Sequence, residues 1–211
     1  MIGTLSKTLD PDDYLHFSDE LARINNAHSM FTGPFVTDHP HRAWEYSIAL
    51  AAAGSRESFI GKRCLDVGCG YSFLGALLAW HGANVTVTDV DDHRGQQEEM
   101  GRIAVSGARL GEPVGSLEFV RGDFKDVLGL VAFDFVTCIS VIEHTETDGR
   151  FFVQLLRSVV PGGTLVLTTD FHPSGQPQCT GHVRTYNDGS LRCLARMAEP
   201  DFHSDGWVMD Y

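Results

Sequence analysis

Long hydrophobic runs are missing from this sequence of 211 residues. No stretch reaches the roughly 18 consecutive apolar residues that a membrane-spanning helix needs, so we expect no membrane partner. The first residues, MIGTLSKTLDPDD, have no apolar core of the kind found in a secretory signal peptide, and we therefore expect a cytoplasmic protein. Cysteine is also sparse. The five cysteines are odd in number and scattered, so we expect no disulfide framework; they are Cys64, Cys69, Cys138, Cys179 and Cys193.

Basic residues are also few. Asp and Glu number 28 against 16 Lys and Arg, which gives a formal net charge of -12, and only three of the basic residues are lysine. A surface of this sign repels a phosphate backbone, which nucleic-acid-binding proteins attract with clustered Lys and Arg. We therefore expect no nucleic-acid partner, although the charge balance leaves room for a local basic groove. The composition, 43% hydrophobic and 21% charged, is that of a globular chain and excludes extended disorder.

Short apolar runs rich in β-branched residues alternate with longer segments of helical period, a pattern typical of an α/β fold. We expect five strands, at Arg63–Val67, Asn84–Thr88, Leu117–Val120, Phe133–Ile139 and Thr164–Thr168. We expect helices at Phe73–Trp80, about Asp92–Ala108 and Asp148–Val159, the last of them ended by a turn at Pro161–Gly163. The run FDFVTCISVI is apolar almost throughout, which is typical of a parallel strand covered on both faces.

Two segments lie outside this pattern. Residues 1–60 predict an N-terminal helical leader or lid, with helical stretches near Tyr14–Asn26 and Arg42–Ala53 separated by the turn-rich His28–Pro40, and residues 61–211 form the main domain. Residues Asp170–Arg184 hold two Pro, two Gly and two His, which predicts a long loop. Both segments can close over the carboxyl ends of the strands, where open α/β sheets bind ligands.

A glycine-rich turn follows the first strand. Residues 64–75, CLDVGCGYSFLG, pass from strand to turn to helix, a geometry that brings the backbone close to a nucleotide at a helix N-terminus. Asp89 ends the second strand, nineteen residues after Gly70, about where an acidic residue meets the hydroxyls of an adenosine ribose. Together, these features predict a cofactor that contains adenosine.

Charge indicates which cofactor this is. A dinucleotide site needs a third glycine where this chain has Phe73, and Asp66 at the end of the first strand would repel the pyrophosphate of NAD. S-adenosylmethionine has no phosphate, and a carboxylate attracts its sulfonium and ammonium groups. Asp66 therefore favours S-adenosylmethionine; the alternative is that it only caps the following turn.

Five motifs follow one another along the chain: LDVGCGYS, VTVTD, GDF at 122–124, FDFVTCISVIEH and PGGTLVLT. In order and spacing they resemble the successive motifs of class I S-adenosylmethionine-dependent methyltransferases, over about residues 60–170. The resemblance implies a Rossmann-like, mostly parallel sheet of seven strands, the last antiparallel, with helices on both faces. It also implies cofactor contacts: Asp66, Gly68 and Gly70 on the methionine side, Asp89 at the ribose, Val90, Asp123 and Phe124 at the adenine, and Ser140 beside the cofactor.

Two features depart from that family pattern. Ser72 stands where the family has its third glycine, which a serine tolerates if the backbone φ there is not positive. The sequence also ends soon after a helical pattern at Gly189–Met197 and a possible sixth strand at Trp207–Met209. Little room remains for the closing antiparallel strand, so we expect either a sheet with one strand fewer or a truncated chain.

Glu143 and His144 follow the fourth strand and are our candidates for catalysis. His144 can take a proton from the acceptor, with Glu143 holding its ring; the alternative is a structural histidine that begins the next helix, with Glu143 as a local cap. Arg42 and Tyr46 are four residues apart on an expected helix and so share a face. One or the other is expected to meet the cofactor's carboxylate, unless this helix serves only for packing.

The remaining candidates lie in the two irregular segments. His172, His182, Arg184 and Tyr186, with Arg42, are expected to contact substrate, and the alternative is a solvated loop. No pair among His39, His41, His172, Cys179 and His182 has the compact spacing of a zinc site, so no metal is expected. Cys64 and Cys69 flank the glycine turn and are expected to be packing residues.

These observations predict transfer of a methyl group from S-adenosylmethionine to a small molecule by in-line displacement, with oxygen or nitrogen as the acceptor atom. The alternatives are an RNA or protein methyltransferase, and a catalytically silent cofactor-binding module. A further alternative, an NAD-dependent dehydrogenase, is opposed by Asp66 and Phe73. The sequence identifies neither the acceptor nor the oligomeric state.

Overall fold

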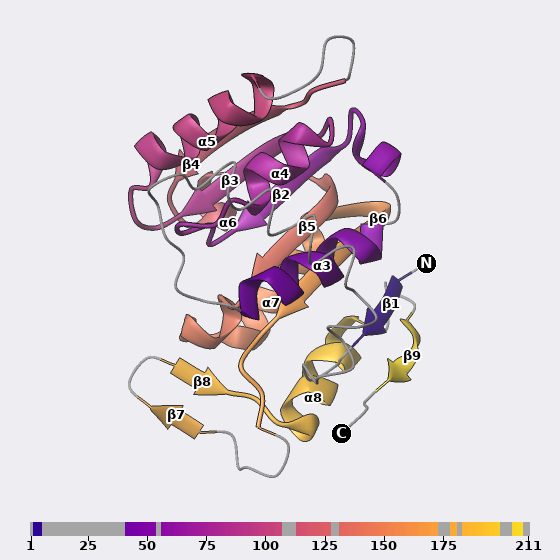
Figure 1. Cartoon of the computed structure of the whole chain (residues 1–211). Helices are drawn as coiled ribbons and strands as arrows, with labels where there is room; N and C mark the ends of the chain where they lie inside the picture. Colours follow the sequence, from indigo (N-terminus) through magenta and orange to yellow (C-terminus); the bar gives the residue numbers. More distant parts are fainter. Residues whose placement is uncertain are drawn as a thin grey trace.

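The centre of the molecule is a parallel sheet of five strands, as Figure 1 shows. The computed structural model describes residues 2–5, 41–53, 56–106, 113–127, 131–172, 178–180, 183–198 and 204–208. The strands lie in the order β4-β3-β2-β5-β6, and their bounds are β2 Arg63–Val67, β3 Asn84–Asp89, β4 Ser116–Arg121, β5 Phe133–Ile139 and β6 Val159–Thr168. The strand order reverses beside β2, which creates the switch point at which such sheets bind ligands.

Helices cover both faces of this sheet, as the sequence predicts. Their bounds are α3 His41–Ala53, α4 Leu74–Trp80, α5 Arg94–Ser106, α6 Phe124–Val127, α7 Asp148–Arg157 and α8 Asp188–Ala198, with 3-10 turns η1 at Arg56–Phe59 and η2 at Ile142–His144. One core cluster joins Tyr46 of α3 and Leu74 of α4 to the sheet, and a second joins Phe124 and Leu155 to its other face. Because side chains alternate along a strand, neighbouring residues of β2 enter opposite clusters. In the part of the chain that the structure describes, no helix has both the length and the apolarity to cross a membrane.

The predicted turn at Pro161–Gly163 is wrong. Strand β6 runs through it, and α7 already ends at Arg157. The pairing with β5 shifts here, because Phe133 lies opposite Val159 while Phe135 lies opposite Thr164. A bulge absorbs the extra residues, and Gly162 has a φ of +80°, which favours glycine. The Pro-Gly-Gly sequence therefore marks an irregularity inside a strand.

The segment Asp170–Arg184, predicted as one long loop, also contains regular structure. Strands β7 Gln178–Thr180 and β8 Val183–Thr185 pair in antiparallel fashion, with Thr180 opposite Val183. Only two residues connect these strands, as in the tightest β-hairpins. The Pro and Gly residues around these strands are typical of loops, which is why the sequence did not predict this short hairpin.

The two ends of the chain form a separate sheet. Strand β9, Ser204–Val208, overlaps the predicted sixth strand but pairs in parallel with β1, Ile2–Leu5, instead of joining the central sheet. The described residues thus supply five of the seven central strands that the family resemblance implies. The predicted leader helix near Tyr14–Asn26 and the turns at His28–Pro40 lie outside the described residues. The predicted helix Arg42–Ala53 is α3, which packs against β5 and β6.

Candidate cofactor site

The glycine turn begins where β2 ends. Gly68 and Gly70 have φ values of +70° and +45°, a region of backbone conformation that favours glycine. The amide groups of Gly68 and Cys69 donate to the carbonyl oxygen of Thr88 in β3, at 2.8 and 3.0 Å. A side chain at Gly68 would collide with Val141, whereas the space beside Gly70 is open. The turn is therefore packed on one side and open on the other.

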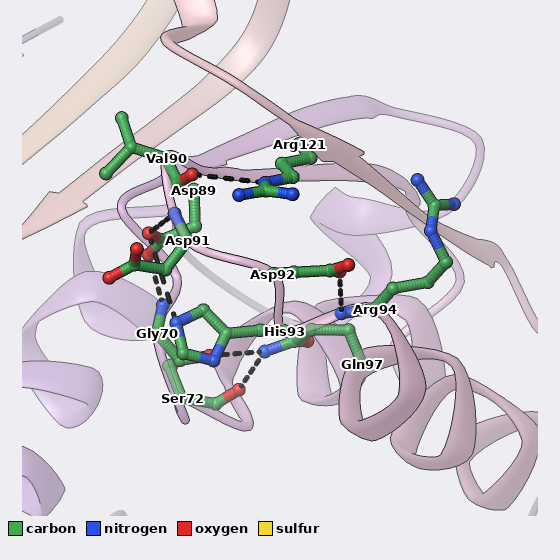
Figure 2. Close-up of polar contacts among 10 residues, drawn as sticks. All are labelled: Gly70, Ser72, Asp89, Val90, Asp91, Asp92, His93, Arg94, Gln97 and Arg121. Atoms are coloured by element: carbon green, nitrogen blue, oxygen red, sulfur yellow. Dashed lines mark hydrogen bonds and ion pairs between the residues drawn. The ribbon is translucent and has the colours of Figure 1, made fainter.

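Asp89 lies against this turn, as the spacing in the sequence predicts. Its Oδ2 accepts a hydrogen bond from the amide of Gly70 at 2.8 Å, and its Oδ1 accepts one from the amide of Asp91 at 3.0 Å (Figure 2). His93 approaches the same carboxylate, with Nε2 4.0 Å from Oδ1. Possible ligand atoms of Asp89, Asp91 and His93 lie within 4.8 Å of one another, a cluster that the sequence analysis did not identify. Exposed acidic groups often gather in this way without an ion, and Asp91 is exposed, so we assign no ion to this cluster.

Gln97 of α5 contacts the glycine turn and was not predicted from the sequence. Its side chain is fully buried, and Nε2 donates to the carbonyl oxygens of Gly70 and Ser72 at 3.1 and 3.0 Å (Figure 2). The hydroxyl of Ser72 accepts from the amide of Leu74 at 3.0 Å and from the hydroxyl of Tyr46 at 2.8 Å. Among the described residues other than glycine only Ser140 has a positive φ, so Ser72 fits its place as predicted. Tyr46 thus contacts the cofactor turn through Ser72.

Asp66 is a buried residue of β2 and lies opposite Thr137 of β5. Its Oδ1 accepts a hydrogen bond from the hydroxyl of Thr137 at 2.7 Å. Burial, with the nearby charges of Asp66 and Asp89, raises the pKa of the Cys69 thiol well above its ordinary value. Burial also raises the pKa of Cys64 to about 12. Both cysteines are therefore neutral packing residues, as predicted.

The residues predicted to contact the adenine have different surroundings. Val90 is 66% exposed, next to Asp89 at the rim of the site. Phe124 is buried in the core and meets the ring of Phe151 edge-on at 5.4 Å. Asp123 forms an ion pair with Lys125. Tyr71 also lies at this rim and was not predicted from the sequence: it is 62% exposed and meets the ring of His93 edge-on at 4.7 Å.

At the end of β5, Ser140 has a φ of +52°. Its amide donates to the hydroxyl oxygen of Thr168 at 3.0 Å, and its own hydroxyl donates to Oε1 of Glu45 at 2.8 Å. The hydroxyl of Thr168 donates to the same Oε1 at 2.6 Å. Glu45 comes from α3 and was not predicted as a site residue from the sequence. These contacts bring α3 to the carboxyl ends of β5 and β6.

The two candidate catalytic residues lie in η2. Glu143 is buried and accepts a hydrogen bond from the hydroxyl of Thr169 at 3.2 Å. His144 is exposed, and its amide donates to the carbonyl oxygen of Val141 at 2.9 Å. His144 is therefore accessible to a molecule that approaches from solvent, whereas the carboxylate of Glu143 is buried.

Arg184 and Tyr186, predicted as substrate contacts, both bind Asp148 at the start of α7. Arg184 forms an ion pair with this carboxylate, and the hydroxyl of Tyr186 donates to it at 3.2 Å. Tyr186 is fully buried, and burial, with the charge of Asp148, raises its pKa. Burial alone would raise the pKa of Asp148, but hydrogen bonds from Arg184, the Gly149 amide and Tyr186 lower it below its ordinary value.

Other substrate candidates are less defined. His172 is exposed, and its amide donates to the carbonyl oxygen of Tyr186 at 2.8 Å. His182 and the side chain of Arg42 lie outside the described residues. The substrate contacts of all these residues stay predictions.

Known proteins resemble this chain in sequence and in structure. Residues 65–167 match the sequence model of a family described as a methyltransferase domain. The mitochondrial ubiquinone biosynthesis O-methyltransferase of Schizosaccharomyces pombe is 37% identical over 116 residues, which cover 54% of this chain and 40% of that protein. The ubiquinone biosynthesis O-methyltransferase of Vibrio atlanticus is 28% identical over 170 residues, covering 79% and 65%.

A solved structure shows the same fold. It is the 1,6-didemethyltoxoflavin-N1-methyltransferase of Burkholderia thailandensis, with bound 1,6-didemethyltoxoflavin and S-adenosylhomocysteine, and it superposes with a TM-score of 0.57 at 20% identity, covering 90% of this chain and 80% of that one. The chain spans about half the length of the curated relatives that it matches. The family match covers the glycine turn, Asp89 and the five central strands almost completely. Residues 65–167 of this chain thus form a methyltransferase domain, with the fold of a class I S-adenosylmethionine-dependent methyltransferase.

Proposed function

We propose that this protein transfers a methyl group from S-adenosylmethionine to an oxygen atom of a small molecule. The observation that carries the proposal is the contact between Asp89 and Gly70, which sets a carboxylate beside an open glycine turn. O-methylation is favoured over N-methylation because the curated relatives named above are O-methyltransferases. The formal net charge of -12 favours a small acceptor over RNA.

The residues around the turn suit this cofactor. The space beside Gly70 is open. Asp66 lies at the end of β2, just before the turn, and Asp89 accepts a hydrogen bond from the turn itself, so both carboxylates favour a cation over a pyrophosphate here. When bound, S-adenosylmethionine supplies an electrophilic methyl group. We assign the methionine side to Asp66, Gly68 and Gly70, the ribose to Asp89, the adenine side to Val90, Asp123 and Phe124, and the flank of the cofactor to Ser140 and Tyr46.

The acceptor needs residues that orient it and one that removes its proton. A hydroxyl group becomes a better nucleophile as its proton leaves, and exposed His144 is the group that we propose as the base. Glu143 is buried and accepts a hydrogen bond from Thr169, a contact that ties the short turn η2, which carries His144, to the residue after β6. In an in-line displacement, the protein accelerates methyl transfer mainly by orienting the acceptor atom toward the methyl group.

Binding and turnover experiments test this proposal separately. Calorimetry should show binding of S-adenosylmethionine and S-adenosylhomocysteine without measurable binding of NAD. Methyl transfer from labelled S-adenosylmethionine should then be measured with a panel of small phenols, alcohols and amines, and with total RNA and protein. We expect label in a small hydroxyl compound. Label only in RNA or protein would contradict the choice of acceptor, and binding without any transfer would favour the silent module.

The role of His144 has its own test. His144→Ala should lower turnover by about 10²–10⁴-fold while the affinity for S-adenosylhomocysteine stays nearly unchanged. Turnover of the wild type should rise with pH, because only the unprotonated imidazole accepts a proton. Measurement with and without a chelator separates this base from a metal ligand. A flat pH profile together with an active His144→Ala variant would end the base hypothesis.

A further inference from the structure

Helix α3 packs on β5 and β6, as Figure 1 shows in indigo and purple, and its residue Glu45 reaches the carboxyl ends of both strands. Neighbouring residues on a helix point about 100° apart, so Glu45 and Tyr46 reach different parts of this edge. Tyr46 contacts Ser72 of the glycine turn, while Glu45 contacts Ser140 and Thr168 at the ends of β5 and β6. One turn of α3 therefore touches both the cofactor turn and the strand end that precedes the proposed base.

Glu45 forms a connected set of hydrogen bonds with the two strand ends. Its Oε1 accepts from both hydroxyl groups, and the Thr168 hydroxyl in turn accepts from the Ser140 amide. Glu45 is only 5% exposed. A buried carboxylate is costly unless it accepts hydrogen bonds, and these two hydrogen bonds offset part of that cost.

The backbone at Ser140 needs this support. Ser140 is the one residue other than glycine with a positive φ in the part of the chain that the structure describes, and such a conformation persists only where the surroundings hold it. Its amide and its hydroxyl are both engaged by the Glu45 set. An observed backbone outlier of this kind often marks a functional position.

The segment that follows Ser140 connects the two halves of the proposed site. Val141 fills the space that a side chain at Gly68 would need, so it packs directly on the glycine turn. Glu143 is held by Thr169, the neighbour of Thr168, and His144 comes next. A change in the backbone at Ser140 would therefore move both the packing on the turn and the proposed base.

We propose that Glu45 is a positioning residue for methyl transfer, which holds Ser140 in its left-handed conformation and thereby sets residues 140–144 against the glycine turn. The proposal rests on the function proposed above. Glu45 acts through Ser140 and Thr168, and it needs no contact with the cofactor or the acceptor.

Two substitutions at Glu45 and one control test this role. Glu45→Ala removes the acceptor oxygen, whereas Glu45→Gln keeps one oxygen in the same place. Glu118→Gln is the matched control, because it removes the same charge from an exposed position on β4. We expect Glu45→Ala to lower kcat about 10- to 100-fold, Glu45→Gln to lower it less, and the control to match the wild type. The KM for S-adenosylmethionine should change less than about threefold in each case.

Hydrogen exchange provides a readout that needs no acceptor. With S-adenosylhomocysteine bound, amides in residues 140–144 should exchange faster in Glu45→Ala than in the wild type, while β2 to β4 stay unchanged. Thermal unfolding gives the folded fraction by which kcat is corrected. Unchanged exchange in 140–144, or wild-type kcat per folded molecule, would overturn the proposal, as would faster exchange throughout the central sheet. If the wild type methylates no acceptor, the proposed function fails, and the exchange data alone decide whether Glu45 holds this segment.

Discussion

Replacing Asp89 by asparagine is the sharpest test of the cofactor site. The two oxygens of this carboxylate accept amide protons from Gly70 and Asp91, at 2.8 and 3.0 Å. Asparagine has almost the same shape but only one oxygen, so its NH₂ group must face one of these two amide donors. A hydrogen bond to a charged group contributes about 1.5–3 kcal/mol, and at least one such bond is lost.

The same change removes the charged acceptor that we assign to the ribose hydroxyls. A loss of about 1–3 kcal/mol of binding free energy corresponds to about 5- to 150-fold weaker binding of S-adenosylhomocysteine. Calorimetry measures this affinity directly, and thermal unfolding separates it from a loss of folded protein.

Asp92→Asn is the matched control for this experiment. Asp92 is an exposed carboxylate only three residues away, and its Oδ1 accepts from the amide of Arg94 at 3.2 Å, away from the glycine turn (Figure 2). The control changes the net charge by the same amount and should leave the affinity near that of the wild type. Equal weakening in both variants would show that general electrostatics, and not the contact at the turn, governs binding. Unchanged affinity in Asp89→Asn would refute the assignment of Asp89.

Two further predictions concern stability and thiol chemistry. Asp148→Asn should lower the free energy of unfolding at pH 7 by about 1–3 kcal/mol, because it removes a charged acceptor of hydrogen bonds. Since the pKa of Asp148 is lowered in the folded state, this difference should be lost as the pH falls through that pKa. Unfolding in urea at several pH values measures the difference, and one that grows in acid would contradict the prediction. Of the four cysteines that the structure describes, exposed Cys193 should react first with a thiol reagent at pH 8, because burial raises the pKa values of Cys64, Cys69 and Cys138; mass spectrometry identifies the modified residue, and early modification of Cys69 in folded protein would count against this order.

The central sheet could be predicted from the sequence because its signals are local and strong. Strand β5 is apolar at almost every position, since helices cover both faces of the sheet, and its predicted bounds Phe133–Ile139 match the structure. Strand β2 was equally well defined, because a glycine turn ends it. The spacing between Gly70 and Asp89 was informative for the same reason: one strand–helix–strand unit fixes where both residues lie.

The irregular parts were harder because local composition and tertiary context disagree there. Pro161, Gly162 and Gly163 have the composition of a turn, but pairing with β5 continues β6 through them by way of a bulge. The segment around β7 and β8 has the composition of a loop, yet Tyr186 next to it is buried against Asp148. The sequence identified Tyr186 as noteworthy but could not show that its hydroxyl faces α7.

The contacts of Glu45 show which kind of information sequence order does not contain. Glu45 is 95 residues from Ser140 and 123 residues from Thr168, so no spacing rule connects them. A local clue does exist, because Glu45 lies beside Tyr46 and one turn before Ala49, both of which are buried. An acidic residue on the buried face of a helix is unfavourable on a purely apolar surface. Such a residue therefore indicates that its helix packs on a polar part of the core, and in an α/β sheet the polar part is the carboxyl edge, where the ligand binds.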